Sequence, residues 1–212
     1  MSGIEELIAE LCPEGVTHCA LGAVATFRRG TPITKNDTVE GSIPVIAGGR
    51  TPAYFHSDSN RSGETIAVAG SGAYAGFVTF WTDPVFVSDA FTVHPDPTLL
   101  APKYVYHFLL ANQEVIHAKK SGGGVPHVKG SDIARLRIPI PPLEIQQEIV
   151  RILDTFTELE AELEAELEAR RRQYAYYRDS LLSFPEGGYG GFRWVSLEQS
   201  SVDSLVNLRM IS

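Results

Sequence analysis

Short apolar runs dominate the middle of the chain. Between residues 43 and 94 these runs are rich in β-branched and aromatic side chains, and clusters of Gly, Asn, Asp and Pro separate them. This composition and spacing are typical of the strands of a β-rich domain. We predict strands at 43–46, 65–68, 76–81, 85–87 and 91–93, with a last strand at 136–140.

Apolar residues at helical spacing predict three helices. The first covers residues 4–11 and is stopped by Pro13 and Gly15, and the second covers residues 103–118. The third covers residues 143–184, contains no Pro or Gly, and at 1.5 Å per residue is roughly 60 Å long. Steps of mostly three and four residues give it one apolar stripe: Ile145, Ile149, Ile152, Phe156, Leu159, Leu163, Leu167, Tyr174, Tyr177 and Leu181.

The length of the third helix indicates that it has a partner, because a compact domain of this size does not need so long an element. We expect it to pair with another helix as a coiled coil, and packing on its own domain is the alternative. Six glutamates alternate with other residues from 158 to 168. This face repels phosphates, so it either is solvated or meets the basic residues 170–172 of an antiparallel partner helix.

The net charge of −8 weighs against a nucleic-acid partner until the charges are located. Residues 1–142 carry 13 acidic and 11 basic side chains, so the acidity belongs to the long helix and the rest is nearly neutral. No apolar run is long enough to cross a membrane, and Cys12 and Cys19 suggest no disulfide framework. We therefore expect a cytoplasmic protein without a membrane partner.

Glycine-rich connections interrupt the predicted strands at 47–54 and 69–76, and a basic glycine-rich loop follows the second helix at 119–127. Residues 28–32 are predicted to form an exposed turn. Sequence signals for catalysis are weak: the surroundings of Ser71 lack the spacing of a nucleophile elbow, and no phosphate-binding loop is present. Cys12, His18 and Cys19 would supply only three metal ligands, so no cofactor or metal is predicted.

A short repeat follows the long helix. Residues 184–187, Phe-Pro-Glu-Gly, echo residues 12–15, Cys-Pro-Glu-Gly, and in each copy a short segment with apolar positions follows. The echo is either the start of a second copy of the domain or a coincidence.

The junction before the long helix carries a resemblance to a known family. The run at 136–150, Leu-Arg-Ile-Pro-Ile-Pro-Pro-Leu-Glu-Ile-Gln-Gln-Glu-Ile-Val, resembles the specificity subunits of type I restriction–modification enzymes. In that family a proline-rich strand ends a target-recognition domain and leads into a long helix. A full member has two such domains, each followed by a helix, and the two helices pair antiparallel. The present sequence has one domain, one helix and the start of a second domain, which resembles a half-subunit.

The resemblance implies an α+β fold: a β-rich target-recognition domain at 1–142, a long coiled-coil helix at 143–184, and a truncated second domain at 185–212. It implies a non-catalytic subunit whose partners are double-stranded DNA, methyltransferase subunits, restriction subunits reached through them, and a second copy or another half-subunit. The bound site would be bipartite. The rivals are a coiled-coil interaction module that binds no DNA and an inactive fragment of a rearranged gene.

The candidate DNA-binding residues lie in or beside the loops. Cationic side chains neutralise phosphates, arginine donates to guanine edges, and glycine lets backbone approach a phosphate. Each of these residues has the alternative role of an ordinary solvent-exposed loop side chain. The candidates are Arg50, Thr51, Tyr54, Arg61, Ser71, Tyr74, Lys119, Lys120, His127 and Lys129.

Overall fold

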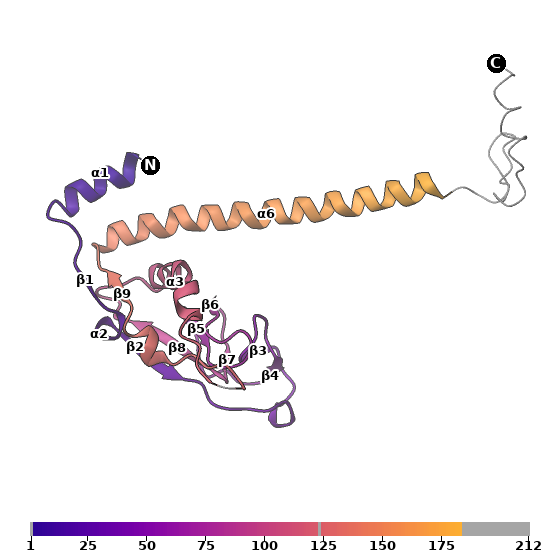
Figure 1. Ribbon diagram of the computed structural model, residues 1–212, viewed down its shortest axis with the longest axis horizontal. Helices are drawn as coiled ribbons and strands as arrows, with labels where there is room; N and C mark the ends of the chain where they lie inside the picture. Colours follow the sequence, from indigo (N-terminus) through magenta and orange to yellow (C-terminus); the bar gives the residue numbers. More distant parts are fainter. Residues whose placement is uncertain (1, 123, 184–212) are drawn as a thin grey trace, which may run out of the picture. The chain divides into compact units, whose positions relative to one another are not determined.

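The computed structural model describes residues 2–122 and 124–183 (Figure 1). It confirms the predicted α+β class, and the chain divides into two units between Phe156 and Thr157. We call residues 2–156 the globular unit. The elements are α1 (Ser2–Leu11), β1 (His18–Ala20), α2 (Leu21–Val24), β2 (Ala25–Arg29), the 3-10 turn η1 (Lys35–Asp37), β3 (Ile43–Ile46), β4 (Tyr54–His56), β5 (Thr65–Ala69), β6 (Val78–Trp81), β7 (Phe86–Val87), β8 (Ala90–Pro95), α3 (Pro102–Ala111), α4 (Gln113–His117), α5 (Gly130–Ile133), β9 (Arg137–Pro139) and α6 (Leu143–Leu182).

Three sheets organise the globular unit. A four-stranded antiparallel sheet has the order β2-β8-β5-β6. A three-stranded sheet has the order β4-β3-β7, in which β3 and β7 run parallel, and β1 pairs with β9. Because β1 and β9 are far apart in sequence, their pairing brings the start of the unit next to the segment that leads into α6.

The four-stranded sheet is covered on both faces. Ile66 and Val68 of β5 belong to the main core, which includes Leu109 of α3 and Ile116 of α4. Ala67, on the other face of β5, joins a smaller core with residues of β3, β7 and β8. Every residue of β5 is buried, which explains its continuous apolar run where a strand with one wet face would alternate.

Two predicted local structures were wrong. The helix expected at 103–118 is divided into α3 and α4 at Asn112, whose backbone leaves the helical region at φ −100° and ψ 14° and whose side chain donates to the carbonyl of Phe108 at 2.8 Å. Val115, expected on the buried side, is 47% exposed as a result of this change of direction. The predicted turn at 28–32 also begins differently, because Arg28 and Arg29 pair with β8 as the last residues of β2.

The long helix α6 ends at Leu182, two residues before the predicted end. The predicted second-domain segment at 185–212 and the second copy of the short repeat at 184–187 both lie outside the described residues. Within the described chain, none of the helices is both long and apolar enough to cross a bilayer.

Candidate DNA-recognition surface

Glycine-rich connections that are distant in sequence meet beside the end of β5. The amide of Val128 donates to the carbonyl of Gly70 at 3.0 Å, and the amide of Gly72 donates to the carbonyl of Pro126 at 2.9 Å. Ser71 and His127 form an isolated β-bridge between these hydrogen bonds. The segment 126–128 therefore lies alongside 70–72 as a short extension of the sheet. Gly72 has a φ of +85°, a conformation in which other residues are strained.

The connection after β3 joins the same cluster. A Cβ at Gly48 would lie 2.5 Å from the carbonyl oxygen of Ser71, so only glycine allows this close approach. Two residues later, the guanidinium carbon of Arg50 lies 5.1 Å from the centroid of the Tyr74 ring and 5.3 Å from that of Phe77. We call residues 47–51, 70–77, 119–122 and 124–129 the loop cluster.

The loop cluster is basic. Lys120 donates from Nζ to the carbonyl of Ala73 at 3.0 Å, which holds its charge over the 70–77 connection. The positive charges also affect His117, at the end of α4. Burial lowers the pKa of His117, and the charges of Lys120 and Arg50 lower it further, while Glu114 has the opposite effect. A concentration of positive charge is what phosphate binding requires.

An open hollow of about 380 Å³ adjoins the cluster at the ends of β2 and β5. Its floor contains the buried residues Ala90, Phe91 and Val128. Four exposed polar side chains stand on its rim: Arg29, Asp89, His127 and Lys129. The Asp89 carboxylate accepts a hydrogen bond from the Ser71 hydroxyl, which links the hollow to the loop cluster.

The structure thus brings most of the predicted DNA-binding residues into one region. The residues that share it are Arg50, Thr51, Ser71, Tyr74, Lys119, Lys120, His127 and Lys129.

Tyr54 and Arg61 are placed differently from the other candidates. The Tyr54 hydroxyl donates to the carbonyl of Ile33. Arg61 donates from Nε to Thr92 Oγ1 at 3.1 Å, from Nη1 to the carbonyl of Asn60 at 2.7 Å, and from Nη2 to the carbonyl of Arg29 at 3.1 Å. All three guanidinium nitrogens of Arg61 already act within the globular unit, so its geometry favours a structural role.

Sequence reasoning missed polar residues on β2, on β8 and just before β8. Arg29 and Asp89 stand on the hollow's rim. Arg28 lies opposite Thr92 in the β2–β8 register. His94 receives or donates a 2.7 Å hydrogen bond with Thr92 Oγ1, and burial together with the charges of Arg28 and Arg61 lowers its pKa. The consecutive arginines before Gly30 were a visible signal, but they were interpreted as a turn. The role of Asp89 had no signal, because it depends on a partner 18 residues away.

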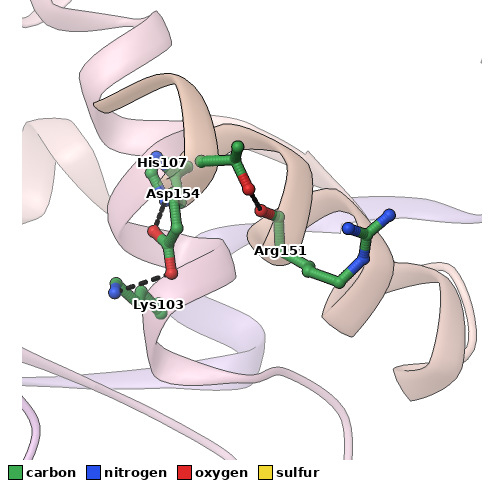
Figure 2. A network of polar contacts seen from close by, with 5 residues as sticks. Lys103, His107, Arg151 and Asp154 are labelled. Atoms are coloured by element: carbon green, nitrogen blue, oxygen red, sulfur yellow. Dashed lines mark hydrogen bonds and ion pairs between the residues drawn. The ribbon is translucent and has the colours of Figure 1, made fainter. Parts of the chain in front are cut away.

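The start of α6 is fixed to the globular unit by a buried amide. Gln146 is fully buried: its Oε1 accepts from the amide of Ala101 at 2.9 Å, and its Nε2 donates to the carbonyls of Leu99 and Pro141, both at 2.8 Å. Two turns later, Asp154 contacts Lys103 Nζ at 2.7 Å and His107 Nε2 at 3.0 Å on α3 (Figure 2). We call residues 143–156 the helix root.

The same contacts set the charge state of Asp154. Burial alone would raise the pKa of this carboxyl, but the hydrogen bonds and charges of Lys103 and His107 outweigh it and hold the pKa below its ordinary value of 3.8. The carboxylate therefore stays ionised and bonded to α3 at neutral pH.

The predicted apolar stripe of α6 is divided by this docking. Ile145 is only 1% exposed, so the prediction that it meets a partner helix is wrong. Ile149 packs against the main core, and this packing does not support the same prediction for Ile149. Ile152 is partly buried. From Phe156, which is 64% exposed, the remaining stripe residues are exposed: Phe156, Leu159, Leu163, Leu167, Tyr174, Tyr177 and Leu181. We call these seven residues the exposed stripe.

The acidic face of α6 has partners within its own helix. Arg170 Nη2 lies 3.4 Å from Glu166, and Arg172 Nη1 lies 3.8 Å from Glu168, both at a spacing of four residues. These surface pairs contribute little to stability, so they leave the acidic face available to solvent or to a partner. In the part of the chain that the structure describes, no group of three His, Cys, Asp or Glu residues is placed to hold a metal ion, and this includes Cys12, His18 and Cys19.

Comparisons with known proteins agree with the resemblance seen at the strand–helix junction. Residues 13–169 match the model of the type I restriction modification DNA specificity domain. The chain is 35% identical over 161 residues to the EcoR124I/EcoR124II type I restriction enzyme specificity subunit of Escherichia coli, a match that covers 69% of this chain and 38% of that protein.

Solved structures show the same fold. The S subunit of a type I restriction–modification system from M. genitalium superposes with a TM-score of 0.64 at 25% identity, covering 80% of this chain and 47% of that one. The HsdS subunit from Thermoanaerobacter tengcongensis gives a TM-score of 0.56 at 19% identity, over 84% of this chain and 50% of that one. The chain spans half or less of the length of these relatives. It belongs to the type I restriction–modification DNA specificity family.

Proposed function

We propose that the chain is a non-catalytic DNA-specificity subunit, whose globular unit binds double-stranded DNA through the loop cluster. The observation that carries this proposal is the convergence of three glycine-rich connections on one sheet end, with Arg50, Lys120 and Lys129 among them. Cations gathered at one surface suit phosphates, and arginine among them suits guanine edges. The family match supports the assignment.

The chemical steps would belong to partners. In this proposal the chain delivers methyltransferase subunits, and through them restriction subunits, to the bound site. The chain itself contributes recognition and spacing. Arg61 and Tyr54 have structural roles in this proposal, because their hydrogen bonds hold the backbone of Arg29 and Ile33, at the end of β2 and just after it.

The exposed stripe supports pairing with a second copy of this chain or with another half-subunit. Seven large apolar side chains on one helical face are costly to leave in water, and knobs-into-holes packing with a like helix would cover them. An antiparallel arrangement would set the acidic positions 158–168 of one helix toward the arginines at 170–172 of the other. The pair would carry two recognition surfaces related by a two-fold axis and would read a bipartite site.

Salt dependence tests the DNA-binding proposal. The full chain, titrated with duplex DNA at several salt concentrations, should lose affinity steeply, because each neutralised phosphate releases condensed counterions. The double variant Arg50→Ala, Lys119→Ala should bind more weakly and flatten the slope of log affinity against log salt by about 1–2. Lys35→Ala removes an exposed cation from η1, outside the cluster, and should leave the slope unchanged.

The same titration separates the proposal from a second function. The exposed stripe alone would also suit a coiled-coil interaction module that binds no DNA. A chain that pairs with itself, yet shows neither salt-steep DNA binding nor any response to the double variant, is that interaction module, and the DNA-binding proposal then fails.

A further inference from the structure

The hollow beside the loop cluster combines a hydrogen-bond acceptor with cationic donors. Arg29 stands opposite Phe91 in the β2–β8 register, and Asp89 precedes Phe91 by two residues, so both side chains line the same hollow. Both are exposed, as are His127 and Lys129 on the same rim. Among the described residues, 2–122 and 124–183, no ion pair within 4.0 Å joins Asp89 to any of these cations. The acceptor and the donors are thus both open to a ligand.

Hydrogen bonds from the two residues that follow β5 hold Asp89 in place. Its carbonyl accepts from the amide of Gly70 at 3.1 Å, and its carboxylate accepts from the hydroxyl of Ser71. Arg29 is held in a similar way, because Arg61 Nη2 donates to its carbonyl at 3.1 Å and its backbone pairs with β8. Side chains that stand on fixed backbone lose less entropy on binding and discriminate better between ligands.

The chemistry of this pair matches a G·C base pair. In the major groove guanine presents two acceptors, N7 and O6, to which arginine donates in bidentate fashion, and cytosine presents an N4 donor, which a carboxylate accepts. A phosphate alone would suit Arg29 and Lys129 but would be repelled by Asp89. A base-pair edge offers both a donor and an acceptor, as the rim does.

We propose that Arg29 and Asp89 are specificity-determining residues that read one G·C base pair in the major groove, with Ser71 and Arg61 as their positioning residues. This proposal rests on the DNA-binding function proposed above and deepens it. It assigns base reading to the ends of the sheet and leaves Lys119, Lys120 and Lys129 to contact phosphates. It also explains why Ser71 faces a carboxylate in a surface otherwise rich in cations.

The test is selection of sites from a randomised duplex pool by the full chain purified with its methyltransferase partner. Wild type should select a motif with a G·C pair at one position. Asp89→Asn should reduce discrimination at that position by roughly 5- to 150-fold and admit an A·T pair, because an amide pairs with the N6 and N7 atoms of adenine. Asp83→Asn makes the same change at an exposed turn between β6 and β7 and should leave the motif as in wild type.

Ser71→Ala distinguishes positioning from general damage to the surface. It should lower discrimination at the same base pair while affinity for unselected DNA stays within about twofold of wild type. Each variant should unfold thermally at the wild-type midpoint, which is the control that its fold is intact. Asp89→Glu, which keeps the carboxylate, should retain the G·C preference.

A motif unchanged in Asp89→Asn would overturn the proposal, and so would an equal loss of affinity for all DNA. Selection of no motif by wild type would instead show that the DNA-binding function itself is wrong. The two failures are therefore distinguishable.

Discussion

The two parts of α6 have similar sequence periodicity and opposite surroundings. In the helix root, Ile145 and Gln146 are buried in the globular unit and Asp154 is bonded to α3. From Phe156 onward the apolar residues at the same spacing are exposed. One helix thus carries two surfaces, one that packs on its own domain and one that stays exposed among residues 2–122 and 124–183.

The difference between the two parts lies in their polar residues. The root pairs its apolar positions with a glutamine and an aspartate that have specific partners on the α3 side. The exposed part has glutamates and arginines that pair mainly along the helix itself. The root therefore docks the start of α6 on the globular unit, and the exposed stripe is the part that the proposed pairing would use.

Breaking the exposed stripe should have the largest effect. Leu163→Asp places a carboxylate at the centre of the stripe in both copies of a pair, and lost burial plus desolvation should weaken pairing by about 4 kcal/mol, roughly a thousand-fold. Sedimentation or light scattering over a concentration series measures the shift from dimer to monomer. Ala165→Asp adds the same charge on the opposite face and should leave pairing nearly intact. Equal effects of the two variants would contradict the assignment of the stripe.

Breaking the root should destabilise the globular unit instead. Gln146→Ala removes three hydrogen bonds and leaves the amide of Ala101 and the carbonyls of Leu99 and Pro141 without their partner. We expect a loss of about 3 kcal/mol in the free energy of unfolding, measured by denaturant titration. Gln147→Ala, at the exposed neighbouring position, should cost less than about 0.5 kcal/mol. If Gln146→Ala weakened pairing and left the free energy of unfolding unchanged, the roles assigned to the root and the stripe would be reversed.

The Asp154 network should contribute a smaller, pH-dependent part of the root's stability. Asp154→Asn should lower the free energy of unfolding by about 1–2 kcal/mol at pH 7. Because the folded-state pKa of Asp154 lies below its ordinary value of 3.8, the carboxylate contributes stability above that value. This contribution is lost as the pH falls through the folded-state pKa.

Denaturant titrations of wild type and Asp154→Asn from pH 7 to pH 3 measure that loss. The difference in unfolding free energy between the two proteins should shrink toward acid. A difference that stays constant or grows at low pH would show that the ion pairs with Lys103 and His107 do not stabilise the root. Asp83→Asn, in an exposed turn, should follow wild type throughout the series.

Local patterns predicted much of this fold. The strands near Ile43, Thr65, Val78 and Phe91 and the extent of α6 follow from composition and periodicity, and the structure confirms them. The pairing of β1 with β9 and the break at Asn112 were not predictable in this way. They depend on contacts between distant segments and on one side chain that competes with the helix backbone.

The candidate site was predicted by residue type better than by role. Arg50 and Lys120 lie in the loops where glycine and charge indicated them, but Arg61 carries the same charge and serves the fold. An arginine's role depends on which carbonyls lie within reach, and sequence spacing does not contain that information. For the same reason, Asp89 had no signal until Ser71 was placed beside it.

Helix length offers the most direct test of the account's central claim, that α6 beyond its root pairs two recognition domains and sets the distance between their half-sites. Deleting one heptad between residues 157 and 167 shortens the helix by about 10 Å, which corresponds to about three base pairs of DNA. Mapping methylated sites on a genome, with the chain co-expressed with a matching methyltransferase subunit, should then show the same two half-sites separated by a gap about three base pairs shorter. An unchanged gap, with methylation retained, would contradict the account.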